Sequence, residues 1–206
     1  MIRIRARRVA FAALATALAV PASARSQDAL PSAEDVIDRY VESIGGRDRV
    51  LSREGSRSTG TFSMPAAGIE GTVEVITGSS PTRVLSRFEI PGLGTILNGY
   101  TGEVGWSMDP NLGPRLLEGK ELAAVVEGSS RHASVRDASL FDARETVEET
   151  EMNGESCYKV RLLWKSGRET FDCYSKESGL LVASIATQES PMGEIEGVTL
   201  MSEYRD

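Results

Sequence analysis

From Gly55 onward the chain consists largely of short runs in which apolar and polar residues alternate, separated by turn residues. In the run 69–77, for example, Val73 and Val75 point to one side and Glu74 to the other. Successive side chains of a strand point to opposite faces of a sheet, so this period of two predicts strands with one apolar face. Ten such strands are predicted, at 58–64, 69–77, 82–90, 95–100, 104–108, 144–152, 156–164, 168–175, 180–189 and 194–204.

Two segments have a helical period instead. Residues 32–44 place apolar side chains on one helical face, with Ser32 as the N-cap and Gly45-Gly46 as the stop signal. A second helix is predicted at 116–126, closing at Gly128, and 129–140 is either a short helix or a loop.

A sheet with one apolar face must cover that face, and ten strands are enough to curl strongly. The fold class predicted is mainly β (α+β). It is a strongly curved antiparallel sheet, or unclosed β-barrel, of about ten strands. The N-terminal helix and the mid-chain helical insert cover its concave face. Residues 25–206 are predicted to form this single domain, with an apolar cavity inside because so few helices are available to fill it.

The first 24 residues have the anatomy of a secretory signal peptide. Arginines are followed by the apolar run 9–20, and then by Pro21 and Ala22-Ser23-Ala24, a small-x-small pattern that predicts cleavage near Ala24. The apolar run has 12 residues, whereas a bilayer-spanning helix needs about 20. The sequence therefore predicts an exported protein, periplasmic or secreted.

Cleavage would remove four of the 23 basic residues and none of the 30 acidic ones, which leaves a formal charge of −11. An acidic body repels phosphate backbones, so nucleic acid is not expected as a partner.

No residue pattern assembles a catalytic site, so no enzymatic activity, cofactor or metal is predicted. His132 is the only histidine and is expected to be a solvated loop residue, whereas metal sites need several ligands at set spacing. Glu70 and Glu74 share a strand face, but it is the polar face, opposite the apolar one.

Cys157 and Cys173 flank a predicted hairpin that turns near Ser166-Gly167. In an exported chain an even pair of cysteines suggests a disulfide. A register that pairs the two would also place Arg161 opposite Glu169. Two buried or free thiols are the alternative.

The candidate ligand-binding residues are those on the apolar faces of the strands. Methionine and aromatic side chains on such a wall suit acyl chains because they adapt in shape. The alternative for each residue is an ordinary packed core. The predicted lining of the cavity is Phe62, Met64, Val73, Val75, Val84, Phe88, Ile90, Leu97, Trp106, Tyr158, Val160 and Leu162.

Three stretches resemble the LolA/LolB-like superfamily of outer-membrane lipoprotein-sorting proteins. They are the helix from Val36 to Gly46, the segment Gly99 to Glu121 with Trp106, and Asn153 to Val182. The closing Met201 to Asp206 also resembles a strand of that family ending in Tyr-Arg. Members often continue with a further strand, so this domain could lack a final one or end naturally.

The resemblance implies a periplasmic half-barrel with a helical lid that holds an apolar guest, such as the acyl chains of a lipid or lipoprotein. It also implies a membrane-associated donor or acceptor protein as a further partner. The alternative is an envelope sensor or interaction module on the same fold, which binds a partner protein instead of carrying lipid.

Overall fold

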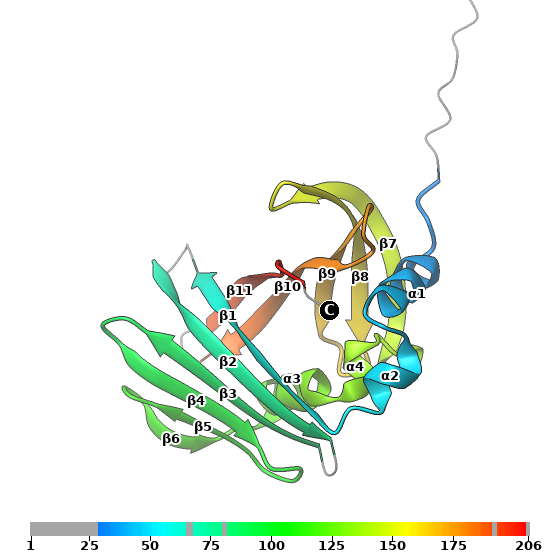
Figure 1. Ribbon diagram of the computed structural model, residues 1–206. Helices are drawn as coiled ribbons and strands as arrows, with labels where there is room; N and C mark the ends of the chain where they lie inside the picture. The colour runs from blue at the N-terminus through cyan, green and yellow to red at the C-terminus, as the bar shows by residue number, and fades with distance from the viewer. Residues whose placement is uncertain (1–28, 65–67, 80–81, 191–192, 205–206) are drawn as a thin grey trace, which may run out of the picture.

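The computed structural model describes residues 29–64, 68–79, 82–190 and 193–204, so the predicted signal peptide lies outside the described residues. Most of the described chain is antiparallel β-structure (Figure 1). The eleven strands are β1 (Gly55–Met64), β2 (Ile69–Ser79), β3 (Thr82–Ile90), β4 (Gly94–Tyr100), β5 (Gly105–Asp109), β6 (Gly113–Leu116), β7 (Phe141–Met152), β8 (Glu155–Trp164), β9 (Glu169–Ser175), β10 (Leu181–Ser190) and β11 (Gly193–Leu200).

The strands follow one another in the order β6-β5-β4-β3-β2-β1-β11-β10-β9-β8-β7. Among the described residues, β1 and β11 are joined by one residue pair, Ser63 with Val198, whereas β1 and β2 pair along ten residues. The two outermost strands, β6 and β7, do not pair with each other, so the barrel is not closed. The molecule therefore has a six-stranded half, β1 to β6, and a five-stranded half, β7 to β11.

The predicted fold class is confirmed, with one more strand than expected. The additional strand is β6, for most of which the sequence predicts no element; only its last residue, Leu116, falls in the predicted helix 116–126. Asp109 Oδ1 accepts hydrogen bonds from the backbone N–H groups of Asn111 and Leu112, at 2.7 and 3.0 Å. This closes a turn that returns the chain alongside β5, and helix α3 (Gly119–Ser129) begins only after it.

Helix α1 (Ala33–Ser43) begins at the predicted N-cap, where the hydroxyl of Ser32 accepts from the N–H of Asp35. Its apolar stripe, including Ile37 and Tyr40, is buried against the inner face of the five-stranded half. The rings of Tyr40 and Tyr174, the latter on β9, have centroids 5.1 Å apart. Short helices α2 (Arg47–Leu51), α4 (Arg131–Ser134) and η2 (Ala138–Leu140) complete this cover (Figure 1).

Helix α3 lies between the two halves and contacts β3 on one side and β10 on the other (Figure 1). Its apolar residues from Leu122 to Val125 are only partly buried and Val126 is exposed, in contrast to the buried stripe of α1. No described helix combines the length and apolar character needed to cross a bilayer. The helices thus cover the inner face of one half closely and that of the other half loosely.

Candidate functional site

The inner face of the six-stranded half is defined by where α3 packs. A Cβ atom added to Gly105 would lie 2.5 Å from Cδ1 of Leu122, so α3 rests directly on this glycine. Cross-strand pairs place Gly105 beside Tyr100, and Tyr100 beside Val84. Residues paired across neighbouring strands share a face. Every second residue from Gly105, Tyr100 and Val84 along its strand therefore faces inward, and the residues between them face outward.

Seven of the predicted lining residues lie together on this inner face, and all come from β1, β2 and β3. They are Phe62, Met64, Val73, Val75, Val84, Phe88 and Ile90. Ile90 is 8% exposed and the other six are only partly buried. Large apolar side chains on a concave face that remain half-exposed leave an open apolar surface, which we call the inner wall.

Contacts within the inner wall show that it is continuous. The rings of Phe62 and Phe88 meet edge to face with centroids 5.4 Å apart, although β2 lies between their strands. They can meet because Gly71 separates them: an added Cβ there would be 2.9 Å from the ring of Phe62. Val73 pairs with Phe88, and Phe88 with Ile96. Ile96 and Ile69 belong to the inner wall but are absent from the predicted lining.

Leu97 and Trp106 lie on the outer face of the same sheet. Leu97 pairs with Arg87 and Met108, and Trp106 pairs with Gly99. A Cβ on Gly99 would be 2.4 Å from the Trp106 ring, which therefore lies flat across this glycine. Ile96 and Leu97 are both apolar, so alternation within β4 alone is ambiguous. The turn that pairs Ile90 with Gly94 decides that Ile96 faces inward.

Tyr158, Val160 and Leu162 belong to the five-stranded half. Val160 and Leu162 are fully buried in the core beneath α1, and Tyr158 packs against that core. The sequence predicts one cavity lined by both halves, whereas these three residues face helices that already cover them.

Two hollows, of about 710 and 380 Å³, lie at the end of the six-stranded half where β3 turns into β4. Turn residues 91–93 and the start of β2 line the first, together with Ile69 and Ile90 of the inner wall. Thr72, Glu89 and Thr95 of the outer face line the second. Ile90 of the inner wall also lines the second hollow. We assign the site to the inner wall and not to these hollows, because both hollows touch the wall only at one end.

The five-stranded half contains a buried polar network. Arg136 Nε donates to Asp172 Oδ2 at 2.6 Å, and the hydroxyl of Tyr174 donates to the same oxygen at 2.9 Å. Burial of Arg136 opposes its charge, but the attraction of Asp172 and then Tyr174 outweighs it and raises the Arg136 pKa. Burial, reinforced by Asp172, raises the pKa of Tyr174 well above its usual value. The network ties the segment after α4 to β9 and is already saturated with internal partners.

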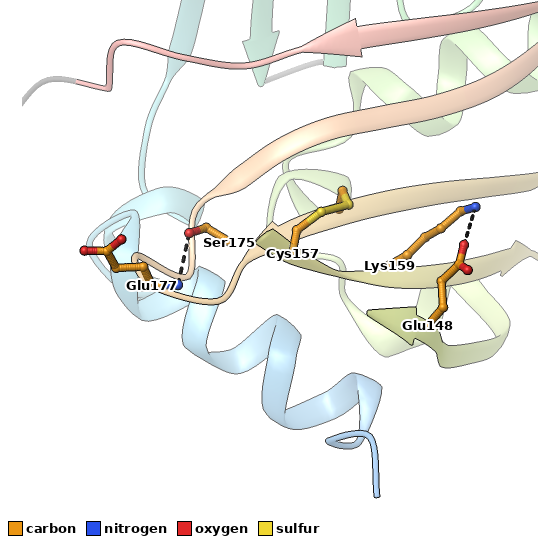
Figure 2. Close-up of a disulfide and its surroundings, with 6 residues drawn as sticks. Glu148, Cys157, Lys159, Ser175 and Glu177 are labelled. Atoms are coloured by element: carbon orange, nitrogen blue, oxygen red, sulfur yellow. Dashed lines mark hydrogen bonds and ion pairs between the residues drawn. A yellow bond between two sulfur atoms is a disulfide. The ribbon is translucent and has the colours of Figure 1, made fainter. Parts of the chain in front are cut away.

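Cys157 and Cys173 form a disulfide between β8 and β9 (Figure 2), as the spacing suggests. The register differs from the prediction: Cys157 pairs with Ser175, and Cys173 with Lys159, so the bond joins diagonal neighbours. The predicted Arg161–Glu169 contact also forms diagonally, with Arg161 Nη2 2.6 Å from Glu169 Oε2. Both cysteines are buried, and disulfides of this kind form in oxidising, extracytoplasmic compartments.

Other candidate groups do not come together. His132 lies on α4 with its side chain 56% exposed, and its Nδ1 is 3.4 Å from Asp137 Oδ2. Within the described part of the chain, no three His, Cys, Asp or Glu residues are arranged to hold a metal ion. Glu70 and Glu74 lie on the outer face, as predicted, and Glu74 forms an ion pair there with Arg57.

Fold and inner wall together define an unclosed β half-barrel with an open apolar concave surface. No protein-family model matches the sequence, and no curated protein matches it. Among solved structures, this chain is similar to a DUF1329 family protein from Desulfovibrio piger, with 13% identity and a TM-score of 0.43 over 82% of this chain and 86% of that one. It is also similar to the Mycobacterium tuberculosis lipoprotein LppX, with 13% identity and a TM-score of 0.37 over 81% of this chain and 93% of LppX.

The Pseudomonas aeruginosa MucA/MucB complex contains a further similar chain, with 16% identity and a TM-score of 0.37 over 82% of this chain. The similarity covers 55% of that chain, so the present protein spans about half of its length.

Proposed function

We propose that this protein is a periplasmic binding protein that shelters the acyl chain of a lipid or lipoprotein on its inner wall, as LolA/LolB-like carriers do. The observation that carries the proposal is the contrast between the halves. Helix α1 buries the inner face of the five-stranded half, while Phe62, Phe88 and their neighbours in the other half stay half-exposed.

An acyl chain would cover this exposed apolar surface. Burying hydrocarbon gains about 0.8 kcal/mol for each CH₂ group. A guest that buries only part of its acyl chain on the inner wall would therefore still bind appreciably. Handing the guest to an acceptor would require α3 to move aside, and the partial burial of its apolar residues suits a mobile cover.

The proposed location follows from two independent features. The first 24 residues have the pattern of a signal peptide that is cleaved near Ala24. The disulfide between Cys157 and Cys173 favours an oxidising compartment, where such bonds form and persist.

Filling the inner wall tests the proposal. Gly60 lies on this wall beside Val73, and a Cβ there would be 3.9 Å from Val73 Cγ1, so a side chain can leave the backbone here without a clash at its first atom. Gly60→Trp should displace a fluorescent monoacylglycerol and reduce lipid co-purified from the periplasm, as measured by fluorescence titration and mass spectrometry. Thr61→Trp is the matched control because Thr61 faces outward. If the two variants bind lipid as the unmodified protein does, the inner wall is not the binding site.

A second candidate function is an interaction module that binds a partner protein, and the outer face of the six-stranded half favours it. Ile76, Trp106 and Leu116 follow one another across the strands, and Leu116 is 63% exposed. Exposed apolar patches of this kind commonly mark protein contacts. Leu116→Lys should abolish in-cell cross-linking to such a partner and leave lipid binding unchanged, whereas loss of lipid binding alone would argue against this role.

A further inference from the structure

A row of polar residues crosses the inner face of the six-stranded half. Ser86 on β3 pairs with Asn98 on β4, Asn98 pairs with Ser107 on β5, and Ser107 pairs with Arg115 on β6. Directly opposite residues of antiparallel strands have Cβ atoms about 5 Å apart. These four side chains, which we call the polar row, therefore form one continuous line on the inner face.

The polar row has unused hydrogen-bonding capacity. Within the described ranges, the side chains of Ser86, Asn98 and Ser107 make no hydrogen bond to another residue. Ser107 as a whole residue is only 4% exposed, although its hydroxyl is not among the fully buried atoms without a partner. The Nε atom of Arg115 is buried and also has no hydrogen-bond partner there. A buried polar group without a partner costs about 1 to 3 kcal/mol, so a guest that supplies acceptors and donors here would remove that cost.

The charge of the polar row is already balanced. Glu121 on α3 accepts from both terminal nitrogens of Arg115, with Nη1 2.5 Å from Oε2 and Nη2 2.8 Å from Oε1. The hydrogen bonds that Arg115 donates to Glu121 raise the pKa of Arg115, and the charges of Glu121 and Asp109 reinforce this. An anionic head group would therefore find no uncompensated positive charge on the polar row and would meet two carboxylates nearby.

On one side of the polar row, the inward-facing side chains of β1 to β4 are apolar up to the end of these strands. The next positions in register are Val73, Phe88 and Ile96. Beyond them come Phe62 and Ile90, and then Met64 paired with Ile69, beside the hollow of about 710 Å³. A tail that starts at the polar row can therefore run over apolar side chains to the open end of the half.

We infer that the polar row binds the uncharged, hydrogen-bonding head group of an amphiphile, such as the hydroxyl and ester groups of a neutral acylglycerol. Its tail lies along the apolar rows toward Met64 and Ile69. This inference rests on the proposed function, and it adds the class of guest and its orientation.

The test compares three probes with the same acyl chain: a monoacylglycerol, the free fatty acid and an alkyltrimethylammonium salt. Titration at neutral pH below their micelle concentrations should show the uncharged probe binding at least about tenfold more tightly than either ion. Equal or tighter binding of an ion overturns the inference and leaves the proposed function standing. Failure of all three probes to bind overturns the proposed function itself.

Charge-changing variants sharpen the result. Glu121→Gln leaves Arg115 without its counter-charge, so affinity for the fatty acid should rise about tenfold relative to the monoacylglycerol. Glu118→Gln is the matched control, since Glu118 lies just before the same helix and its side chain makes no capping bond. Asn98→Leu should weaken monoacylglycerol binding several-fold, with thermal melting used to confirm that each variant is folded. If Glu121→Gln and Asn98→Leu keep the probe preference of the unmodified protein, as the control should, the polar row does not contact the head group.

Discussion

At the scale of single residues, the Arg136–Asp172 pair is the place where a small change should matter most. Asp172 is 1% exposed and accepts from both Arg136 and Tyr174. Removing one partner of a buried ion pair leaves the other charge without compensation, which costs about 3 to 5 kcal/mol.

Asp172→Asn keeps the volume but removes the negative charge, so it should lower the free energy of unfolding by about 3 to 5 kcal/mol. Chemical denaturation at neutral pH measures this loss. Asp142→Asn removes the same charge at an exposed position and should change stability by less than about 0.5 kcal/mol. Equal effects of the two substitutions would show that the buried pair contributes no more than a surface charge.

Asp137 makes a pH-dependent contribution to stability. Hydrogen bonds with the backbone and the side chain of Ser139 lower the pKa of Asp137 from 3.8 to about 2. A hydrogen bond with His132 and the charge of Arg47 add to this effect. Because the folded pKa is the lower one, the stabilisation is present above pH 3.8 and is lost as the pH falls through about 2.

Asp137→Asn should therefore destabilise the protein at neutral pH, and the difference from the unmodified protein should shrink as the pH falls through about 2 and disappear only below that value. Asparagine can still accept from Ser139, so the difference reports the charge and its contact with Arg47, 3.0 Å away. Urea denaturation at both pH values measures it. A difference that stays constant between the two would rule out titration of Asp137 as the cause.

At the scale of elements, the β8–β9 hairpin is held by the disulfide on the outer face. Figure 2 shows the bond beside the Lys159–Glu148 ion pair, whose N–O distance is 2.9 Å. Met152 and Ala183 pack around the two sulfur atoms. The bond fixes β9, whose opposite face carries Asp172 and Tyr174 in the core beneath α1.

Replacing both cysteines by alanine should lower the free energy of unfolding by about 3 kcal/mol, since the bond closes a loop with a sequence separation of 16. The native disulfide should also resist dithiothreitol until the protein unfolds, because both cysteines are buried. Thiol labelling with and without urea measures this. Rapid reduction of the folded protein would indicate an accessible bond.

At the scale of the whole molecule, the two halves differ in how well they are packed. Ile90 is the one buried hydrophobic residue described on strands β1 to β6, whereas β7 to β10 contribute most of the strand residues of the core. Backbone amides in loosely packed regions exchange faster with solvent.

Hydrogen exchange should therefore be slower in β8 and β9 than in β4 and β5, in the protein without a guest. Adding a monoacylglycerol should slow exchange in the six-stranded half selectively, since the guest would cover that half. Uniform protection of both halves without a guest would contradict the difference in packing. Mass spectrometry of peptides from each half measures both effects.

Local sequence patterns predicted most elements because their causes lie within a few residues. Alternation within each run predicted ten of the eleven strands, and the hydroxyl of Ser32 set the start of α1. The β6 strand was missed because only the turn at Asp109 aligns residues 113–116 with β5, and four residues carry too little pattern to show it.

Tertiary structure decided which faces and which half form the candidate site. Leu97 and Trp106 look like wall residues by composition, but strand register turns them outward. Val160 and Leu162 alternate as wall residues do, yet α1 packs on them and fills the space.

The amino-acid sequence by itself thus determined a one-sided, curved sheet with few helices, because alternation and turn chemistry act between neighbours in the chain. Only the folded structure decided that α1 covers one half and leaves the inner wall around Phe88 open. Register and helix docking join residues far apart in the chain, and no local pattern encodes them.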